Sequence, residues 1–386
     1  MGRYVKKNKI YIFKQKLKRY ELANKLNKIR NILLKKGNDK SEAFLIDDAE
    51  HVTIHFPNNI EKPKVGVVYD GIYLGETLPT AYWPKYKRFL DYNEIPYGFI
   101  NMNRSTWIED CINYDIIAWH VSNEPSSLED AQTKIYLLEN YYNKTCYPSQ
   151  KEIWFYEDKI KQHYLFRILG IPTVETFITN DDSEALRYIQ NLKFPIVSKI
   201  KTGSESKGVK LITNRKEASK HIDKVFLEGE KTYWTYLKQK DYVYYQHFLA
   251  DALYDLRVIG VGNKYFGYFR LRPKDDFRAS GAGIYEKKEI PYEVLEIARS
   301  VKEALRATLI AVDLICSEKD KSYKVIEASI FIRVDTPEQL KVNGVPGYYQ
   351  YDGGKFTFKP GRYWVQELAL NEVIGEWVRK RGDGQL

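Results

Sequence analysis

The sequence contains little cysteine and no long apolar run. Its three cysteines, Cys111, Cys146 and Cys316, are widely separated and odd in number, which disfavours a disulfide framework or a zinc site and favours a reducing compartment. No segment approaches the run of about 18 apolar residues that a membrane-spanning helix needs. The first residues, MGRYVKKNKIYIFKQK, also lack the apolar core of a signal peptide. We therefore expect a cytoplasmic protein.

Two glycine-rich nucleotide motifs are also absent. Gly203 and Gly208 have the separation of the glycines in a Walker loop, but Val209 stands where that motif needs a lysine followed by Ser or Thr. After the first predicted strand, residues 70–75 read DGIYLG and lack the G-x-G spacing of a dinucleotide site. These absences exclude a Walker-type phosphate loop and disfavour a Rossmann cofactor domain.

Positive charge is concentrated at one end of the chain. The first 40 residues hold fourteen lysines and arginines against Glu21 and Asp39, a net charge of +12, whereas the whole chain carries +10. Within this segment apolar residues recur at nearly helical intervals, namely Phe13, Leu17, Tyr20, Ile29 and Leu33. We therefore expect a basic helical arm. It either packs on the body of the protein or binds anionic lipid or another polyanion, and the sequence leaves both open.

The length of 386 residues predicts two or three domains. After the arm (1–63), strands alternate with helices, which predicts a parallel α/β domain over residues 64–148. Residues 149–335 change to antiparallel strands with interspersed helices, an α+β pattern. The aromatic residues 336–386 predict a strand pair followed by an amphipathic helix that packs on the preceding domain.

The stretch SKIKTGSESKGVKLI, residues 198–212, reads as a strand, a loop with two glycines and several hydroxyls, and a second strand. Such a loop suits either a phosphate, through converging backbone N–H groups, or a plain hairpin turn. Charged residues are also embedded in or beside apolar strands, where they need partners or an anionic ligand. Asp313 in AVDLI and Glu327 in KVIEASI supply oxygen ligands of the kind that Mg²⁺ prefers.

In their order and spacing these segments resemble ATP-grasp enzymes, especially ligases of the RimK and glutathione-synthetase kind. The resemblance places Lys159, before GIPTVET, and Lys199, in FPIVSKI, on the ATP phosphates. It implies that TGSESKG is a flap over the phosphates, and that YYQHFL is the hinge that holds adenine. The cofactor-binding residues implied in this way are Lys159, Lys199, Gly203, Ser204, Ser206, Gly208, Gln246, His247, Phe248, Leu249 and Asp255.

The same resemblance implies the remaining parts of the site. Arg257, Arg270 and Arg278 would lie near the γ-phosphate and the acceptor carboxylate. Asp313, Glu327 and Ser329 would hold Mg²⁺, with Mn²⁺ as an alternative metal. Ser329 departs from the asparagine of many relatives, and a hydroxyl is a poorer ligand than an amide oxygen. The implied fold is an α/β domain followed by two α+β subdomains that grip ATP.

These features predict an ATP- and Mg-dependent ligase that joins a carboxylate to an amine through an acyl phosphate. The acceptor would be a peptide or a surface-polymer precursor. Two alternatives remain: a small-molecule kinase of the same fold, and a nucleotide-binding regulatory protein without catalysis. Single residues have plainer interpretations as well: a sheet-edge ion pair for Arg270 or Arg272, aromatic packing for His247, and a turn at Gly281 and Gly283. Homo-oligomer formation is left open.

Overall fold

A computed structural model describes residues 46–384, apart from 74–75, 79, 204–207, 235, 253, 274–282, 318, 320 and 333–335. The chain divides into two units, Met1–Leu45 and Ile46–Leu386. The predicted basic helical arm lies in large part outside the described residues. Its last part, from the short helix η1 (Ile46–Asp48) onward, is fixed to the second unit: the indole of Trp364 donates to Ile46 O at 2.8 Å, and Glu50 N donates to Arg362 O at 2.7 Å.

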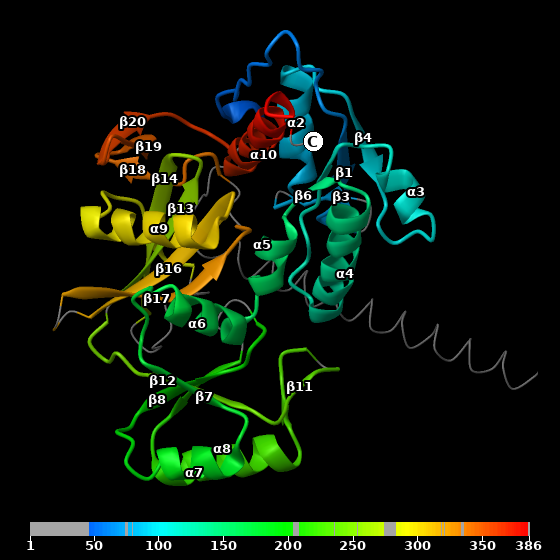
Figure 1. Ribbon diagram of the computed structural model, residues 1–386. Coiled ribbons are helices and arrows are strands. Elements are labelled where there is room, and N and C mark those ends of the chain that lie inside the picture. The colour runs from blue at the N-terminus through cyan, green and yellow to red at the C-terminus, as the bar shows by residue number, and fades with distance from the viewer. Residues whose placement is uncertain are drawn as a thin grey trace, which may run out of the picture. The chain divides into compact units, whose positions relative to one another are not determined.

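The predicted parallel sheet is present in the first part of this unit (Figure 1). Its strands are paired in the order β4 (Tyr97–Ile100), β1 (Val65–Val68), β5 (Ile116–Ala118) and β6 (Thr145–Tyr147), and every pair is parallel. Every residue of β1 is buried, as expected for a strand covered on both faces. The helices of this part are α2 (Trp83–Tyr92), α3 (Trp107–Cys111) and α4 (Pro125–Tyr141), and β2 (Ile72–Tyr73) pairs with β3 (Glu76–Thr77).

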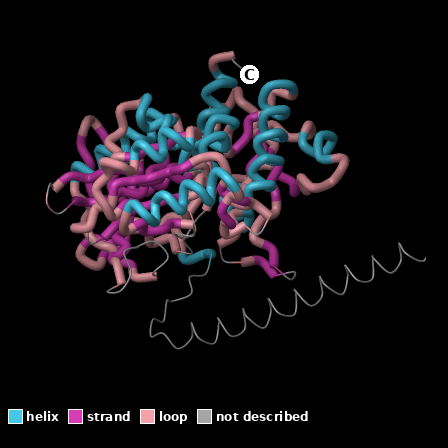
Figure 2. Tube along the Cα trace, turned by 90° about the horizontal axis from the view of Figure 1, so that it is seen from below, coloured by secondary structure: helices cyan, strands magenta, loops and turns pink. Residues whose placement is uncertain are grey.

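A second, antiparallel sheet follows helices α5 (Gln150–Phe155) and α6 (Lys159–Ile168). Its order is β7 (Thr176–Thr179), β12 (Val243–His247), β8 (Ile196–Lys199) and β9 (Val209–Ile212). Helices α7 (Asp182–Tyr188) and α8 (Arg215–Leu227) lie along one side of it (Figure 1). Figure 2 shows the helices and strands of the chain from below. Its apolar core is separate from the main core of the unit. A small hairpin, β10 (Glu230–Lys231) with β11 (Lys238–Gln239), extends from it.

The third sheet is the largest, and it is antiparallel throughout. Its main order is β17 (Ser322–Ser329), β16 (Leu309–Ser317), β13 (Tyr254–Val261), β14 (Lys264–Leu271), β19 (Val345–Asp352) and β18 (Lys341–Val342). In addition, β15 (Tyr285–Glu286) pairs with β14, and β20 (Lys355–Pro360) pairs with β19. Helix α9 (Tyr292–Leu305) packs on β13 and β16. These are the mixed α/β and α+β layers that the sequence predicts.

The C-terminal helix α10 (Val365–Gly382) joins the parallel sheet to the largest one, because it contacts α2, β6 and β13 (Figure 1). The prediction of an amphipathic helix is wrong for its first half, where residues 365–370 are all buried. Among them, Glu367 is completely buried and accepts from Arg88 Nη1 of α2 at 2.7 and 2.9 Å. The helix needs no polar face there because other elements surround it.

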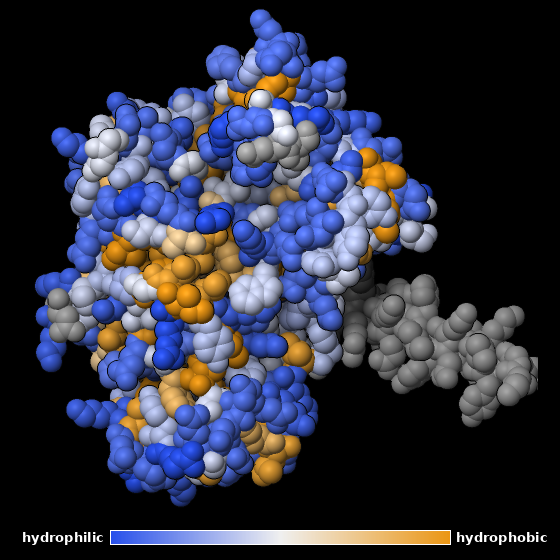
Figure 3. All heavy atoms as spheres, in the orientation of Figure 1, coloured by the Kyte–Doolittle hydropathy of each residue, from blue (hydrophilic) through white to orange (hydrophobic). Residues whose placement is uncertain are grey.

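The surface of the described unit is largely hydrophilic, with a gathering of apolar atoms between α9 and α6 on the face that Figure 3 shows. Ile168 and Leu169 are exposed at the end of α6. Among the described helices, none combines the length and the apolar character that a bilayer crossing requires.

Candidate active site

Lys159 links three elements at the junction of the two antiparallel sheets. It is the first residue of α6, whose start is fixed by Asp158, which accepts from Ile160 N and Lys161 N at 3.1 Å. The Lys159 ammonium is buried and donates to Gly203 O at 2.7 Å and to Glu327 Oε1 at 3.0 Å. Burial alone would lower the pKa of Lys159, but Glu327 and Glu157 outweigh this and raise it, so the amine is charged.

Lys199, the last residue of β8, is a second buried amine beside the same loop. Within the described part of the chain it forms no hydrogen bond and no ion pair. Burial lowers its pKa to about 8, and the charge of Lys159 adds to this effect while Glu327 opposes it. A buried amine that forms no ion pair among the described residues, beside a glycine-bearing loop, is suited to an anionic ligand.

The glycine-bearing loop that follows Lys199 in the sequence begins at Gly203 and ends at Gly208. Gly208 has a φ of +79°, and a Cβ there would lie 2.4 Å from Ile200 Cδ1, so the position requires glycine. Ser204 and Ser206, which the sequence predicts to bind the cofactor, lie outside the described residues, as does Arg278. The loop is therefore anchored at both ends, by the Lys159 contact at Gly203 and by close packing at Gly208.

Asp313 and Glu327 lie opposite each other on β16 and β17, beside an irregularity in the register between Asp313 and Leu314. Arg257 donates two hydrogen bonds to the Asp313 carboxylate, from Nε to Oδ1 at 2.7 Å and from Nη2 to Oδ2 at 2.8 Å. Arg270 Nη2 lies 2.9 Å from Asp313 Oδ2, and Arg270 Nε donates to the Asp255 carboxylate. Two arginines and two aspartates thus form one buried ion cluster across three strands.

The two aspartates of this cluster differ in pKa. Burial favours the neutral carboxyl of Asp313, but Arg257 and Arg270 outweigh it and hold the pKa below its ordinary value. Burial raises the pKa of Asp255, although Arg270 opposes the shift. Asp313 is therefore the more acidic of the two carboxyls. The described contacts of Asp255 are with Arg270, and its binding to the cofactor stays a prediction. The plainer interpretation of Arg270 as an ion-pair residue agrees with its contacts, although the pair is buried rather than exposed.

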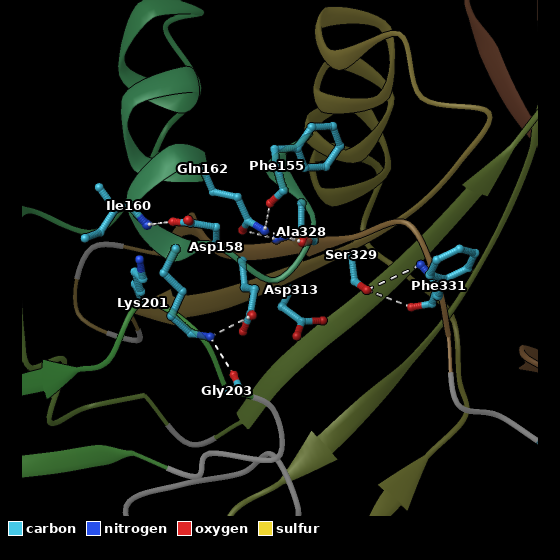
Figure 4. Close-up of polar contacts among 12 residues, drawn as sticks. Phe155, Asp158, Ile160, Gln162, Lys201, Gly203, Asp313, Ala328, Ser329 and Phe331 are labelled. Carbon is cyan, nitrogen blue, oxygen red and sulfur yellow. Dashed lines mark hydrogen bonds and ion pairs between the residues drawn. The ribbon is translucent and has the colours of Figure 1, made fainter. Parts of the chain in front are cut away.

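Two of the three predicted metal ligands have the oxygen donors that a divalent cation prefers. Asp313 and Glu327 offer carboxylate oxygens, which fit a hard cation such as Mg²⁺. Ser329 instead donates its hydroxyl to Phe331 O at 2.8 Å, as Figure 4 shows with Asp313 nearby. The described residues contain no group of three or more His, Cys, Asp or Glu that could hold a metal by itself. The donor set fits a magnesium ion that brings phosphate and water oxygens with it, and the metal site stays a prediction.

The predicted hinge lies at the end of β12. Gln246 is buried and donates to Thr176 Oγ1 of β7 at 3.0 Å, while His247 is exposed and its backbone N–H donates to Glu175 O at 2.9 Å. Phe248 and Leu249 follow, partly buried. His247 pairs with Ile196, at the opposite end of β8 from Lys199. The predicted adenine and phosphate positions are thus separated along one pair of strands.

Residues 156–342 match the family described as the RimK-like ATP-grasp domain. The α-aminoadipate–LysW ligase LysX of Saccharolobus solfataricus is 29% identical over 228 residues, which are 58% of this chain and 72% of the relative. D-alanine–D-alanine ligase of Bacillus anthracis, complexed with ATP, has a TM-score of 0.55 at 15% identity and covers 84% of this chain and 100% of its own. Residues 156–342 of this chain are an ATP-grasp domain.

These comparisons confirm the predicted ATP-grasp fold. The family match and the LysX relative support the assignment to ATP-dependent ligases that form C–N bonds. An ADP complex of N5-carboxyaminoimidazole ribonucleotide synthetase also has this fold, with a TM-score of 0.50 at 11% identity over 83% of this chain and 98% of its own. Likeness at this identity concerns the fold. The roles of single residues in this ATP-grasp chain rest on its own geometry.

Sequence reasoning missed Gln162 of the ATP-grasp site. Its side chain donates to Ala328 O at 2.8 Å and accepts from Ala328 N at 3.0 Å, which fixes α6 to β17 beside Glu327 (Figure 4). Gln162 is buried, and it follows Lys159 by three residues on α6. Positions three apart share one face of a helix. That spacing was the one available signal, because the partner is a backbone group 166 residues away.

Proposed function

We propose that this chain is an ATP- and Mg-dependent ligase that joins a carboxylate to an amine through an acyl phosphate. The observation that carries the proposal is the arrangement of Lys159 and Lys199 beside Gly203, Glu327 and Asp313. It supports a position for the nucleotide phosphates between the two lysines, with adenine at the end of β12. Two buried amines and one loop of backbone N–H groups would hold the phosphate charge.

In the first step, a carboxylate oxygen of the substrate would attack the γ-phosphorus, and ADP would leave with the electron pair of the broken P–O bond. In the second, the amine would attack the carbonyl carbon and phosphate would leave. A bound Mg²⁺ would neutralise charge on the transferring phosphoryl group. Arg257 would contribute charge at the same place while it holds the Asp313 carboxylate. Catalysis would therefore rest on position and charge.

The class of acceptor follows less directly. The relative from Saccharolobus solfataricus is named for the pair α-aminoadipate and LysW, which supports an amino acid as one partner here. A peptide or a surface-polymer precursor as the other partner is the proposal that the sequence suggests. Binding of the basic residues 1–40 to an anionic polymer or membrane, and homo-oligomer formation, are proposals of the same kind.

One observation favours a second candidate function. The Ser329 hydroxyl donates to Phe331 O and accepts from Phe331 N, and a hydroxyl is a poorer metal ligand than an amide oxygen, which supports a nucleotide-binding regulator without turnover. The test is ADP release with ATP and Mg²⁺ in the presence of carboxylates alone, amines alone and both together. A ligase requires both, a kinase requires one acceptor, and a regulator releases no ADP. ADP release that is independent of any amine would overturn the ligase proposal.

Removal of residues 1–40 offers a separate check, because the net charge of +12 lies there. We expect the truncated protein to keep turnover of small substrates and to lose binding to anionic vesicles. A folded truncated protein that binds no ATP would show instead that these residues belong to the nucleotide site.

A further inference from the structure

Asp70 and His120 meet at the point of the parallel sheet where the chain changes direction. From β1 the chain goes to β4 on one side of the sheet, and then crosses to β5 and β6 on the other. In open parallel sheets, ligands bind outside the carboxyl ends of the two strands on either side of such a point. Those strands are β1 and β5, and Asp70 and His120 each follow one of them by two residues.

The two side chains are held in a defined orientation. The Asp70 carboxylate accepts from Tyr82 N at 2.9 Å and from Trp83 N at 3.0 Å, at the start of α2, and it contacts His120 Nδ1. The His120 ring stacks on the Tyr82 ring, with centroids 4.0 Å apart and planes 12° apart. A carboxylate can only accept, so Nδ1 carries a proton, and in the neutral ring Nε2 carries a lone pair.

His120 Nε2 is available to a ligand. The His120 side chain is 20% exposed, and no described residue forms a hydrogen bond with Nε2. The Asp70 carboxylate, in contrast, is 8% exposed and already holds two backbone N–H groups. Asp70 is therefore fixed in place, whereas His120 can contact another molecule through Nε2.

Phe331 lies between the Asp70–His120 pair and the ATP-grasp site. The centroid of the Phe331 ring lies 4.7 Å from that of His120 and 5.5 Å from that of Tyr82, and both ring pairs are edge to face. Phe331 is the residue that binds the Ser329 hydroxyl, four residues after Glu327 (Figure 4). The Tyr82 hydroxyl also accepts a hydrogen bond from Ile332 N at 2.7 Å.

We propose that His120 Nε2 binds the amine acceptor and takes its proton, while Asp70 positions the imidazole. The inference rests on the proposed ligase function. An amino-acid amine is largely protonated at neutral pH and must lose a proton before it can attack. One proton of the bound ammonium would pass to Nε2 and then to solvent, which frees the nitrogen lone pair for attack. As the C–N bond forms, the carbonyl carbon would release phosphate with the electron pair of the C–O bond, and the second amine proton would leave to the phosphate or to solvent. Histidine is the side chain that most often performs such a transfer.

The test compares two acceptors in the same protein. Hydroxylamine is largely unprotonated at neutral pH, so it intercepts an acyl phosphate as a hydroxamate without a base. The full chain would be incubated with ATP, Mg²⁺, an equimolar mixture of the protein amino acids and α-aminoadipate, with or without hydroxylamine. Amide and hydroxamate products would be measured by mass spectrometry. The variants are His120→Gln and Asp70→Asn, and the control is His55→Gln, which changes an exposed histidine.

We expect the ratio of amide to hydroxamate to fall about 100-fold in His120→Gln, within the range for loss of a general base, and at least tenfold in Asp70→Asn. The ratio should stay at the wild-type value in His55→Gln. Structural damage would lower both products together and would leave the ratio unchanged, so an unchanged ratio in folded variants overturns the proposal. A wild type that forms hydroxamate but no amide overturns the assignment of an amino-acid amine. Absence of hydroxamate as well shows that the ligase chemistry itself fails, and the inference fails with it.

Discussion

The Lys159 ammonium lies 3.0 Å from Glu327 Oε1, which joins the first residue of α6 to the end of β17 across 168 residues of sequence. The same ammonium holds Gly203 O, so one charge fixes the loop, the helix and the carboxylate strand relative to one another. Lys199, close by, has no such partner among the described residues. The two lysines therefore differ: Lys159 also holds the site together through protein contacts, whereas the Lys199 ammonium forms none among the described residues.

Lys199→Ala is expected to weaken ATP binding by about 1.5–3 kcal/mol, the range for a charge-assisted hydrogen bond. The loss should fall on binding because the Lys199 ammonium forms no hydrogen bond or ion pair with the described residues. Isothermal titration calorimetry would measure it, with Lys193→Ala, an exposed lysine that precedes β8, as the control. Equal ATP affinity in wild type and folded Lys199→Ala would remove Lys199 from the nucleotide site.

The affinity for ATP is expected to depend on pH through Lys199. In the free protein its pKa is about 8, and bound phosphate raises it because it favours the charged amine. Binding therefore takes up a proton above pH 8. Affinity should be nearly constant below pH 7.5 and fall above pH 8, by up to about tenfold per pH unit. Lys199→Ala should lack this slope, whereas a slope that persists in the variant would assign the titration to another group.

Glu327→Gln is expected to release little ADP while it still binds nucleotide. The substitution keeps size and one acceptor oxygen but removes the charge that would hold a metal ion and that pairs with Lys159. Coupled ADP assays and calorimetry on the same sample would separate turnover from binding, and Glu289→Gln, an exposed glutamate, is the control. Normal ADP release by the variant would exclude Glu327 as a metal ligand.

Ser329→Asn is expected to lower the Mg²⁺ concentration needed for half-maximal ADP release, because an amide oxygen is a better ligand than a hydroxyl. The substitution also removes the hydroxyl bond to Phe331 O. A magnesium titration of ADP release measures the effect. If wild type releases no ADP with any pair of substrates and Ser329→Asn does, the regulatory function would replace the ligase function.

Arg88→Met is expected to lower the free energy of unfolding by about 3–5 kcal/mol at pH 8, since it leaves Glu367 buried without its partner. Burial raises the pKa of Glu367 from 4.5 to about 7 despite Arg88. The folded state thus binds more protons than the unfolded state between these values, and stability falls as pH rises through them. In the variant the loss should be smaller at pH 5, where Glu367 is neutral.

Urea unfolding at both pH values would test this prediction. Arg104→Met serves as the control, because Arg104 is 63% exposed and its Asp110 contact is 4.0 Å long. Equal losses at pH 5 and pH 8 would show that packing, rather than the charge of Glu367, determines the stability of this contact.

The sequence alone determined the order of the elements and the family, because both depend on local patterns. The sequence also determined one contact of the buried ion cluster, the pair of Asp255 and Arg270. The two-residue turn between β13 and β14, at Gly262 and Asn263, sets the register of that hairpin, and this register places Asp255 opposite Arg270. Such a pairing follows from a turn and from strand alternation.

Only the tertiary structure decided the contacts that join distant segments. Arg257 faces Asp313 because β13 pairs with β16, across a connection that no local turn fixes. Gln162 binds the backbone of Ala328, and a backbone group is the same in every residue type except proline, so the sequence does not mark this partner. Asp70 meets His120 because two parallel strands end side by side. In each case the energy comes from burial and long-range pairing, which nearby residues do not encode.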